Sequence, residues 1–178
     1  MNDQEENLWE IHKLSCEWVR FADSKASIIL ATQGLIATVA IPQVMPLAEP
    51  LVRNWQVITL IILAVLSAGW SGLSAILAIV PRLKGRTKDA AAIPTSCIFF
   101  EHIAKNHKNA SLFATSVSPI VSDTRLIQKE LSHQIWANSL VATRKFKYTR
   151  SAVVSLAASL ALGMAATILY FCQQAFKA

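Results

Sequence analysis

The sequence has few charges and few of the residues that shape other protein classes. Only 16% of its 178 residues are charged, with five glycines and three cysteines, whereas 53% are hydrophobic. Average globular chains are about 25% charged and about 45–50% apolar. The scarcity of charge excludes an intrinsically disordered chain, the scarcity of glycine excludes a collagen-like repeat, and the scarcity of cysteine excludes a disulfide-stapled secreted peptide.

The apolar residues are concentrated in three stretches that contain no Asp, Glu, Lys, Arg or His. These stretches are residues 26–45, 57–80 and 152–171, which are 20, 24 and 20 residues long. About 20 helical residues cross the roughly 30 Å core of a bilayer, so a soluble enzyme is excluded. The sequence predicts an all-α integral membrane protein with three transmembrane helices and a small cytosolic helical part, assembled as an oligomer. The expected segments are a cytosolic amphipathic helix over 1–25, a two-span hairpin over 26–80, a cytosolic helical segment over 81–151 and a third span over 152–172.

Basic residues near the span ends predict the orientation. Of the Lys and Arg close to the ends of the spans, eleven lie on the side of the N-terminus and of residues 81–151, and only Arg53 and Lys177 lie on the other side. Basic flanks tend to stay in the cytoplasm, so we expect the N-terminus inside, a turn over 42–56 outside and the C-terminus outside. The first 25 residues carry a net charge of −3, which is unlike a secretory signal, so the first apolar run is expected to be a retained span.

Residues 81–151 contain twelve Lys and Arg against four acidic residues, a net charge of +8. Two explanations stay open: anchoring to anionic lipid headgroups, or binding of an anionic cytosolic ligand. No nucleic-acid-binding pattern is present, so nucleic acid is not an expected partner. The sequence also lacks a metal-ligand spacing, a nucleophile paired with a base and a glycine-rich phosphate loop, so we expect neither a metal, a cofactor nor an enzyme.

Apolar periodicity predicts the remaining helices. Leu8, Ile11, Leu14 or Ser15, Trp18 and Ala22 recur every three to four residues and predict the apolar face of an N-terminal helix that runs unbroken into the first span. A short helix is expected over 95–108, a weaker element over 106–118 and, after Ser122 and Asp123, a long helix that continues into the third span. Its predicted apolar face carries Ile127, Leu131, Ile135, Ala142 and Phe146.

Small residues form rows at helical spacing within the spans. These rows are Ala64, Ala68 and Gly72; Ser67, Ser71 and Ala75; and Ser155, Ser159, Gly163 and Thr167. Such rows let membrane helices approach closely, either inside one chain or between copies. Gln33 is the most polar side chain of the first span, and it is expected to face either the bundle interior or a water path.

Residues 18–30, Trp-Val-Arg-Phe-Ala-Asp-Ser-Lys-Ala-Ser-Ile-Ile-Leu, carry a family pattern. They resemble the membrane-entry motif of the transmembrane effectors of Pycsar antiphage systems, the PycTM family, in which Trp-x-x-x-Ala-Asp-x-Lys-Ala precedes an apolar helix. Residues 99–104 and 131–139, followed by Arg144 and Lys145, match further stretches in the same order. The resemblance covers the chain from about Trp9 to Tyr170.

This resemblance implies a multi-pass effector of the bacterial inner membrane that works with a paired cyclase. A cyclic pyrimidine mononucleotide, cyclic CMP or cyclic UMP, would activate it through the cytosolic segment over 81–151, impair membrane integrity and cause abortive infection. Candidate ligand-binding residues are Gln134, Asn138, Arg144, Lys145 and Lys147. Amide side chains can read a pyrimidine edge and cations can face a phosphate, although a solvated polar face explains the same pattern.

Three residues near the first span are candidates for coupling ligand binding to the membrane helices. They are Trp18, Asp23 and Lys25. Asp23 and Lys25 would also fit at the cytosolic end of the span without any coupling role, with Lys25 reaching the headgroups. The alternative function is a constitutive membrane scaffold or accessory subunit whose basic helices recruit a cytosolic partner.

Overall fold

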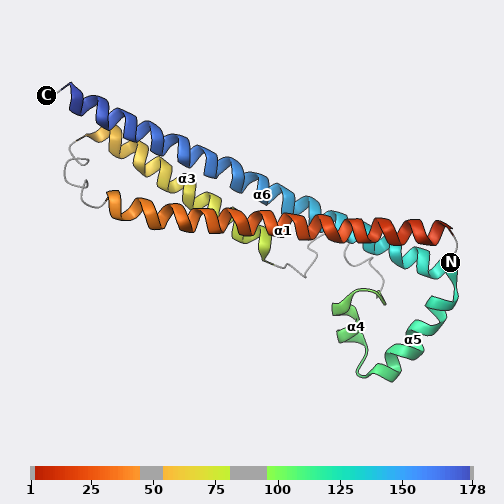
Figure 1. Cartoon of the computed structure of the whole chain (residues 1–178). Helices are drawn as coiled ribbons and strands as arrows, with labels where there is room; N and C mark the ends of the chain where they lie inside the picture. The colour runs from red at the N-terminus through yellow and green to blue at the C-terminus, as the bar shows by residue number, and fades with distance from the viewer. Residues whose placement is uncertain (1–2, 45–53, 81–95, 177–178) are drawn as a thin grey trace. The chain divides into compact units, whose positions relative to one another are not determined.

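The computed structural model describes residues 3–44, 54–80 and 96–176, and every element assigned among them is an α-helix (Figure 1). The helices are α1 (Asp3–Val44), α3 (Trp55–Ile79), α4 (Phe100–Asn106), α5 (Ala110–Ser122) and α6 (Thr124–Ala175). The predicted turn around Pro46 and Pro50, the basic run from Arg82 to Lys88 and the linker over 90–94 lie outside the described residues.

Three of these helices, α1, α3 and α6, are long and apolar enough to cross a membrane. They contain residues 26–44, 57–79 and 152–171 of the three uncharged runs, so the predicted all-helical fold with three helices that could span a membrane is confirmed. With 42 residues, α1 is about 63 Å long, and α6 with 52 residues is about 78 Å long. Both exceed the roughly 30 Å that a span requires. The predicted passage of each helix into its apolar run without a break is also confirmed.

The chain divides into two compact units. One unit combines Met1–Phe21 with Pro81–Thr143, and the other combines Ala22–Val80 with Arg144–Ala178. Within the second unit, α1, α3 and α6 pack around a core of small residues. Ala26 and Ile29 of α1 meet Ala75 and Ala78 of α3 and Ala152 of α6. Small side chains at these positions allow close approach of the helix backbones, as is typical of membrane bundles.

Serine hydroxyls join α3 to α6 inside the second unit. Ser67 donates to the carbonyl of Ser155 at 2.8 Å, and Ser71 donates to the carbonyl of Ala152 at 2.7 Å. The residue numbers rise on one helix as they fall on the other, so α3 and α6 are antiparallel. The row containing Ser67, Ser71 and Ala75 is therefore used for packing within one chain.

Gln33 lies in the interior of the same bundle. Its Nε2 atom donates to the carbonyl of Ala68 at 3.0 Å, and its Oε1 atom faces Gly72. The row of Ala68 and Gly72 thus faces α1. Of the two positions expected for Gln33, the structure shows the bundle interior.

The first unit differs from expectation in its shorter elements. The helix expected over 95–108 is limited to α4, and Ser96 and Cys97 before it are hydrogen-bonded to α6 instead. The weaker element expected over 106–118 is a regular helix, α5, displaced toward the C-terminus. Asn109 caps it by accepting from the Leu112 amide at 2.9 Å. The predicted cap of the long helix is confirmed, since Asp123 Oδ1 accepts from the Arg125 amide at 2.8 Å.

The apolar face predicted for the start of α1 is only partly correct. Ser15 and Ala22 are buried as expected, but Ile11, Leu14 and Trp18 are each about half exposed, at 48–51%. The side of α1 that packs within the chain carries small and polar residues, because these permit close helix contact. On α6 the prediction is closer, since Leu131 and Ala142 are buried.

Candidate functional site

Gln134 lies on the inner side of α6 in the first unit rather than on a solvated face. It is 5% exposed, and its Nε2 atom donates to Ser96 Oγ at 2.7 Å. Ser96 is itself 2% exposed. A buried amide has to be hydrogen-bonded to offset the cost of removing it from water, and Ser96 supplies the partner.

A second side chain of α6, Glu130, holds the same segment one turn before Gln134. Glu130 Oε2 accepts from the Cys97 amide at 3.3 Å, and the Ser96 amide donates to His102 Nδ1 at 3.1 Å. Burial, and then the charge of Glu130, raise the pKa of the Cys97 thiol above its usual range. Sequence reasoning missed Ser96 and Glu130. The spacing of Glu130 and Gln134, four residues apart on a predicted helix, was the available signal.

Asn138 lies one turn beyond Gln134 and contacts α1. Its Nδ2 atom donates to Ser15 Oγ and to Cys16 Sγ, both at 3.3 Å. Ser15 donates in turn to the carbonyl of His12 at 2.7 Å. Burial lowers the pKa of the His12 imidazole, because desolvation disfavours the charged ring. Both predicted amide residues are thus engaged by internal partners.

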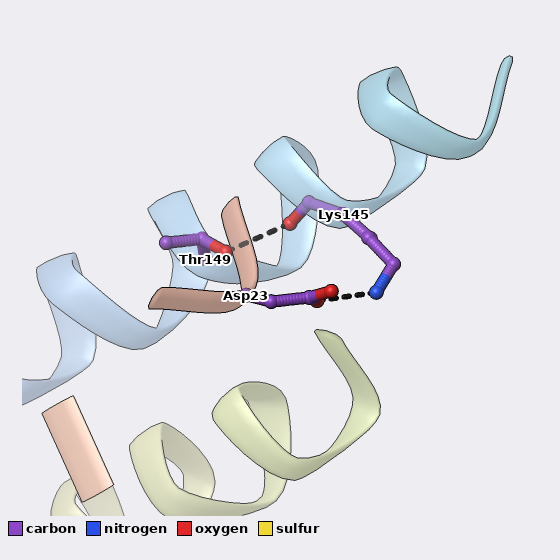
Figure 2. A network of polar contacts seen from close by, with 3 residues as sticks. All are labelled: Asp23, Lys145 and Thr149. Atoms are coloured by element: carbon purple, nitrogen blue, oxygen red, sulfur yellow. Dashed lines mark hydrogen bonds and ion pairs between the residues drawn. The ribbon is translucent and has the colours of Figure 1, made fainter. Parts of the chain in front are cut away.

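The predicted cations lie in the second unit. Lys145 forms an ion pair with Asp23 of α1, and its carbonyl accepts from Thr149 Oγ1 at 2.9 Å; Figure 2 shows the two contacts side by side. The Lys145 side chain is 13% exposed and that of Asp23 is 38% exposed. Arg144 and Lys147 are exposed. The structure therefore brings together one ligand candidate and one coupling candidate of the sequence prediction.

The other two coupling candidates, Trp18 and Lys25, occupy exposed positions of α1. They lie on a different side of the helix from Asp23, which faces α6. Among residues 3–44, 54–80 and 96–176, the structure holds no group of three or more His, Cys, Asp or Glu arranged to bind a metal ion.

The candidate side chains on α6 are hydrogen-bond donors, and such donors can exchange one acceptor for another. Gln134 and Asn138 in the first unit, and Lys145 in the second unit, each donate to an acceptor within their own unit. Their acceptors in this structure are Ser96, Ser15, Cys16 and Asp23.

Comparison with known proteins identifies the family. The model of the Pycsar effector protein domain, PycTM, matches residues 7–172. The chain belongs to the Pycsar effector family. PtPycTM, a Pycsar effector protein of Propioniciclava tarda, is 27% identical over 155 residues, which are 84% of this chain and 71% of that protein. No solved structure matches.

The family resemblance inferred from residues 18–30 is confirmed. The chain is thus a membrane effector of antiphage defence, in a family that works with the signal of a paired cyclase. Asp23 of the entry motif has a defined partner in this Pycsar effector, the ammonium group of Lys145.

Proposed function

We propose that a cyclic pyrimidine mononucleotide, cyclic CMP or cyclic UMP, activates this Pycsar effector and that the activated protein impairs the inner membrane, causing abortive infection. The observation that carries the proposal is the internal engagement of the candidate ligand groups. Gln134, Asn138 and Lys145 each hold an acceptor within the chain. A ligand that uses these donors must therefore break contacts of the resting protein, which links binding to a change of state.

The chemistry of the candidates fits the proposed ligand. The amides of Gln134 and Asn138 can donate to and accept from the edge of a pyrimidine base. The cyclic phosphate is a monoanion, for which Arg144, Lys145 and Lys147 are the candidate partners. Arg144 and Lys147 are exposed, whereas Lys145 has to leave Asp23 first.

The ion pair of Asp23 with Lys145 is the proposed coupling element, with Trp18 and Lys25 as further candidates on α1. Moving a two-state population from 1:99 to 99:1 needs about 5.5 kcal/mol of differential binding. A small nucleotide reaches this value only through several contacts that are made in one state and absent from the other. Release of Lys145 from a partly buried carboxylate would be one such difference.

The proposal is tested with purified protein in dye-loaded vesicles and by calorimetric titration. Cyclic CMP or cyclic UMP should bind and release the dye, whereas cyclic AMP at the same concentration should do neither. Gln134→Ala should weaken binding about tenfold, whereas Gln128→Ala, an amide on the same helix that the proposal does not use, should leave it within twofold. Absence of binding and leakage with both pyrimidine nucleotides would overturn the proposal and favour the scaffold function.

A further inference from the structure

Basic residues of the second unit gather in one short stretch of α6, between Arg144 and Arg150. Among the described residues of this unit, Asp23 is the only acidic one, and it pairs with Lys145 (Figure 2). Arg144, Lys147 and Arg150 are exposed. In its described part, the unit therefore has no second acidic residue that could neutralise these exposed cations.

Two polar contacts between α3 and α6 mark the ends of the membrane part of the bundle. At one end, Gln173 Nε2 donates to Gln56 Oε1 at 3.4 Å. At the other end, Trp70 Nε1 donates to Ser151 Oγ at 3.3 Å. Ser151 precedes Gln173 by about 33 Å along the helix, which is close to the roughly 30 Å thickness of a bilayer core. Ser151 therefore lies at one edge of the core, at the end that the sequence predicts to be cytosolic.

Lys147 and Arg150, here called the headgroup pair, lie at the level of the lipid phosphates. Arg150 directly precedes Ser151, and Lys147 lies about 6 Å from Ser151 along the helix. The polar layer on each side of the bilayer core is about 5–8 Å thick, so both cations fall within it. Arg144 lies about 10 Å from Ser151, beyond this layer.

The headgroup pair stands at the end of an exposed apolar surface formed by both helices. At about 100° per residue, Val154 lies within about 40° of each member of the pair on α6, and it is 60% exposed. Ser151 lies about 40° from Lys147, and it is held by Trp70, which is 57% exposed. Leu66, one turn from Trp70 on α3, is 65% exposed. An acyl chain that descends from the headgroup pair meets these apolar side chains.

We propose that Lys147 and Arg150 bind the phosphate of an anionic phospholipid, whose acyl chain lies against Trp70 and Val154. The chemical group that they recognise is a phosphodiester monoanion. Lys147 supplies a compact charge, and the planar guanidinium of Arg150 can donate two parallel hydrogen bonds to phosphate oxygens. Basic residues beside membrane helices are a known basis of anionic-lipid binding.

A cyclic mononucleotide contains the same chemical group, and Lys147 is also a candidate for it in the proposed function. Two observations favour lipid at the headgroup pair. The pair lies at the depth of the lipid phosphates, and the exposed apolar surface below it suits an acyl chain, which a nucleotide lacks. Arg144 and Lys145 remain as the cations for a nucleotide phosphate.

The bound lipid holds the turn of α6 that carries the ion pair. Lys145 points about 160° away from Lys147 around the helix and pairs with Asp23 of α1. This turn is therefore fixed by protein on one side and by a lipid phosphate on the other.

Quenching by brominated lipid tests the site at Trp70. The protein with Trp9→Phe, Trp18→Phe, Trp55→Phe and Trp136→Phe is reconstituted in vesicles of brominated phosphatidylcholine, and unbrominated phosphatidylglycerol is added in increasing fraction. Phosphatidylglycerol that replaces the quencher beside Trp70 restores its fluorescence, so the titration gives the relative affinity of the two lipids. Each basic residue near an anionic surface strengthens binding by a factor of about five, so we expect a preference for phosphatidylglycerol of about fivefold or more.

Variants of single cations locate the preference. Lys147→Gln and Arg150→Gln should each lower it about threefold to fivefold, and the double variant should remove it. Arg125→Gln, which makes the same change of charge far earlier on the same helix, should leave the preference within about 1.5-fold. A preference that is absent, or that the double variant keeps, would overturn the proposal.

Native mass spectrometry of the protein that keeps all its tryptophans supplies a second measurement, which decides alone if the phenylalanine variant loses its α-helical circular dichroism. The protein and Arg125→Gln should retain bound phosphatidylglycerol, whereas equal retention by the Lys147→Gln, Arg150→Gln double variant would refute the site. Displacement of the lipid by an equal concentration of cyclic CMP or cyclic UMP would assign the headgroup pair to the nucleotide instead. The other measurements contain no nucleotide, so their result is independent of whether a nucleotide activates the protein.

Discussion

The substitution Gly72→Ala tests how the helices of the bundle pack, because it adds one carbon atom where α3 contacts α1. A Cβ atom built there lies 3.1 Å from Gln33 Oε1, whereas Gly69, on the same helix, has no neighbour within 4 Å of an added Cβ. Replacing glycine by alanine inside a helix stabilises it by about 0.8–1 kcal/mol, because the unfolded glycine chain has more conformational freedom to lose. Gly69→Ala should show this gain in full.

At Gly72 the gain should be offset. The added methyl group has to displace the Gln33 amide, whose Nε2 atom holds the Ala68 carbonyl at 3.0 Å. Hydrogen bonds between membrane helices contribute on average about 0.6 kcal/mol and at most about 1.7 kcal/mol. Gly72→Ala should therefore stabilise the protein by about 0.6–1.7 kcal/mol less than Gly69→Ala, so that its net effect lies between a small gain and a loss of about 0.9 kcal/mol.

The assay is reversible unfolding of the purified protein in mixed micelles, followed by tryptophan fluorescence as the denaturing detergent fraction rises. Combining Gly72→Ala with Gln33→Ala should recover the full gain relative to Gln33→Ala alone, because the obstructing amide is gone. Equal stabilisation by Gly72→Ala and Gly69→Ala, unchanged by Gln33→Ala, would refute the placement of Gln33 between α1 and α3. It would instead fit a glutamine that lies in water or lipid.

Three further outcomes follow from single contacts. Burial lowers the pKa of His12, so the folded protein should lose stability as the pH falls below about 6.5, where the unfolded chain binds a proton more readily than the folded chain. The thermal unfolding midpoints at pH 8 and pH 5.5 should therefore differ less in His12→Gln than in the unsubstituted protein. Glu130 helps to raise the pKa of Cys97, so Glu130→Gln should increase the rate of Cys97 alkylation at pH 8, although burial should keep it below that of a free thiol. Asp23→Asn and Lys145→Met should each destabilise the protein by about 1–3 kcal/mol. Because the pair is only partly buried, a double-mutant cycle should give a coupling energy of about 1 kcal/mol. Losses that simply add in the double variant would contradict the ion pair.

Much of the fold could be predicted because its determinants are local. The three uncharged runs are each long enough to span a bilayer, and nothing interrupts the helical pattern between Asp123 and the third span. The face of α1 was harder to predict. Hydrophobicity alone favours Ile11 and Leu14 for the inside, but close helix packing selects small residues such as Ser15 and Ala22.

The helical positions of the candidate amides could be predicted from the sequence, whereas their hydrogen-bond partners could not. The spacing of Gln134 and Asn138 places both amides on one side of a helix, which the structure confirms. Their partners could not be predicted, because Ser96 is separated from Gln134 by 38 residues and Ser15 from Asn138 by 123. Such contacts depend on how distant segments pack, and no local pattern of charge or hydrophobicity records them.

The serine contacts between α3 and α6 have a consequence for how this family can diverge. Ser67 and Ser71 donate to main-chain carbonyls, which are present at positions 155 and 152 whatever side chain stands there. The hydrogen bonds themselves therefore require particular side chains on α3 only, and they accept any side chain at position 155. Position 152 stays restricted in size, because Ala152 packs against Ala75 and Ala78 of α3. A search for paired substitutions among relatives would overlook this contact, even where the two helices bind one another in the same register.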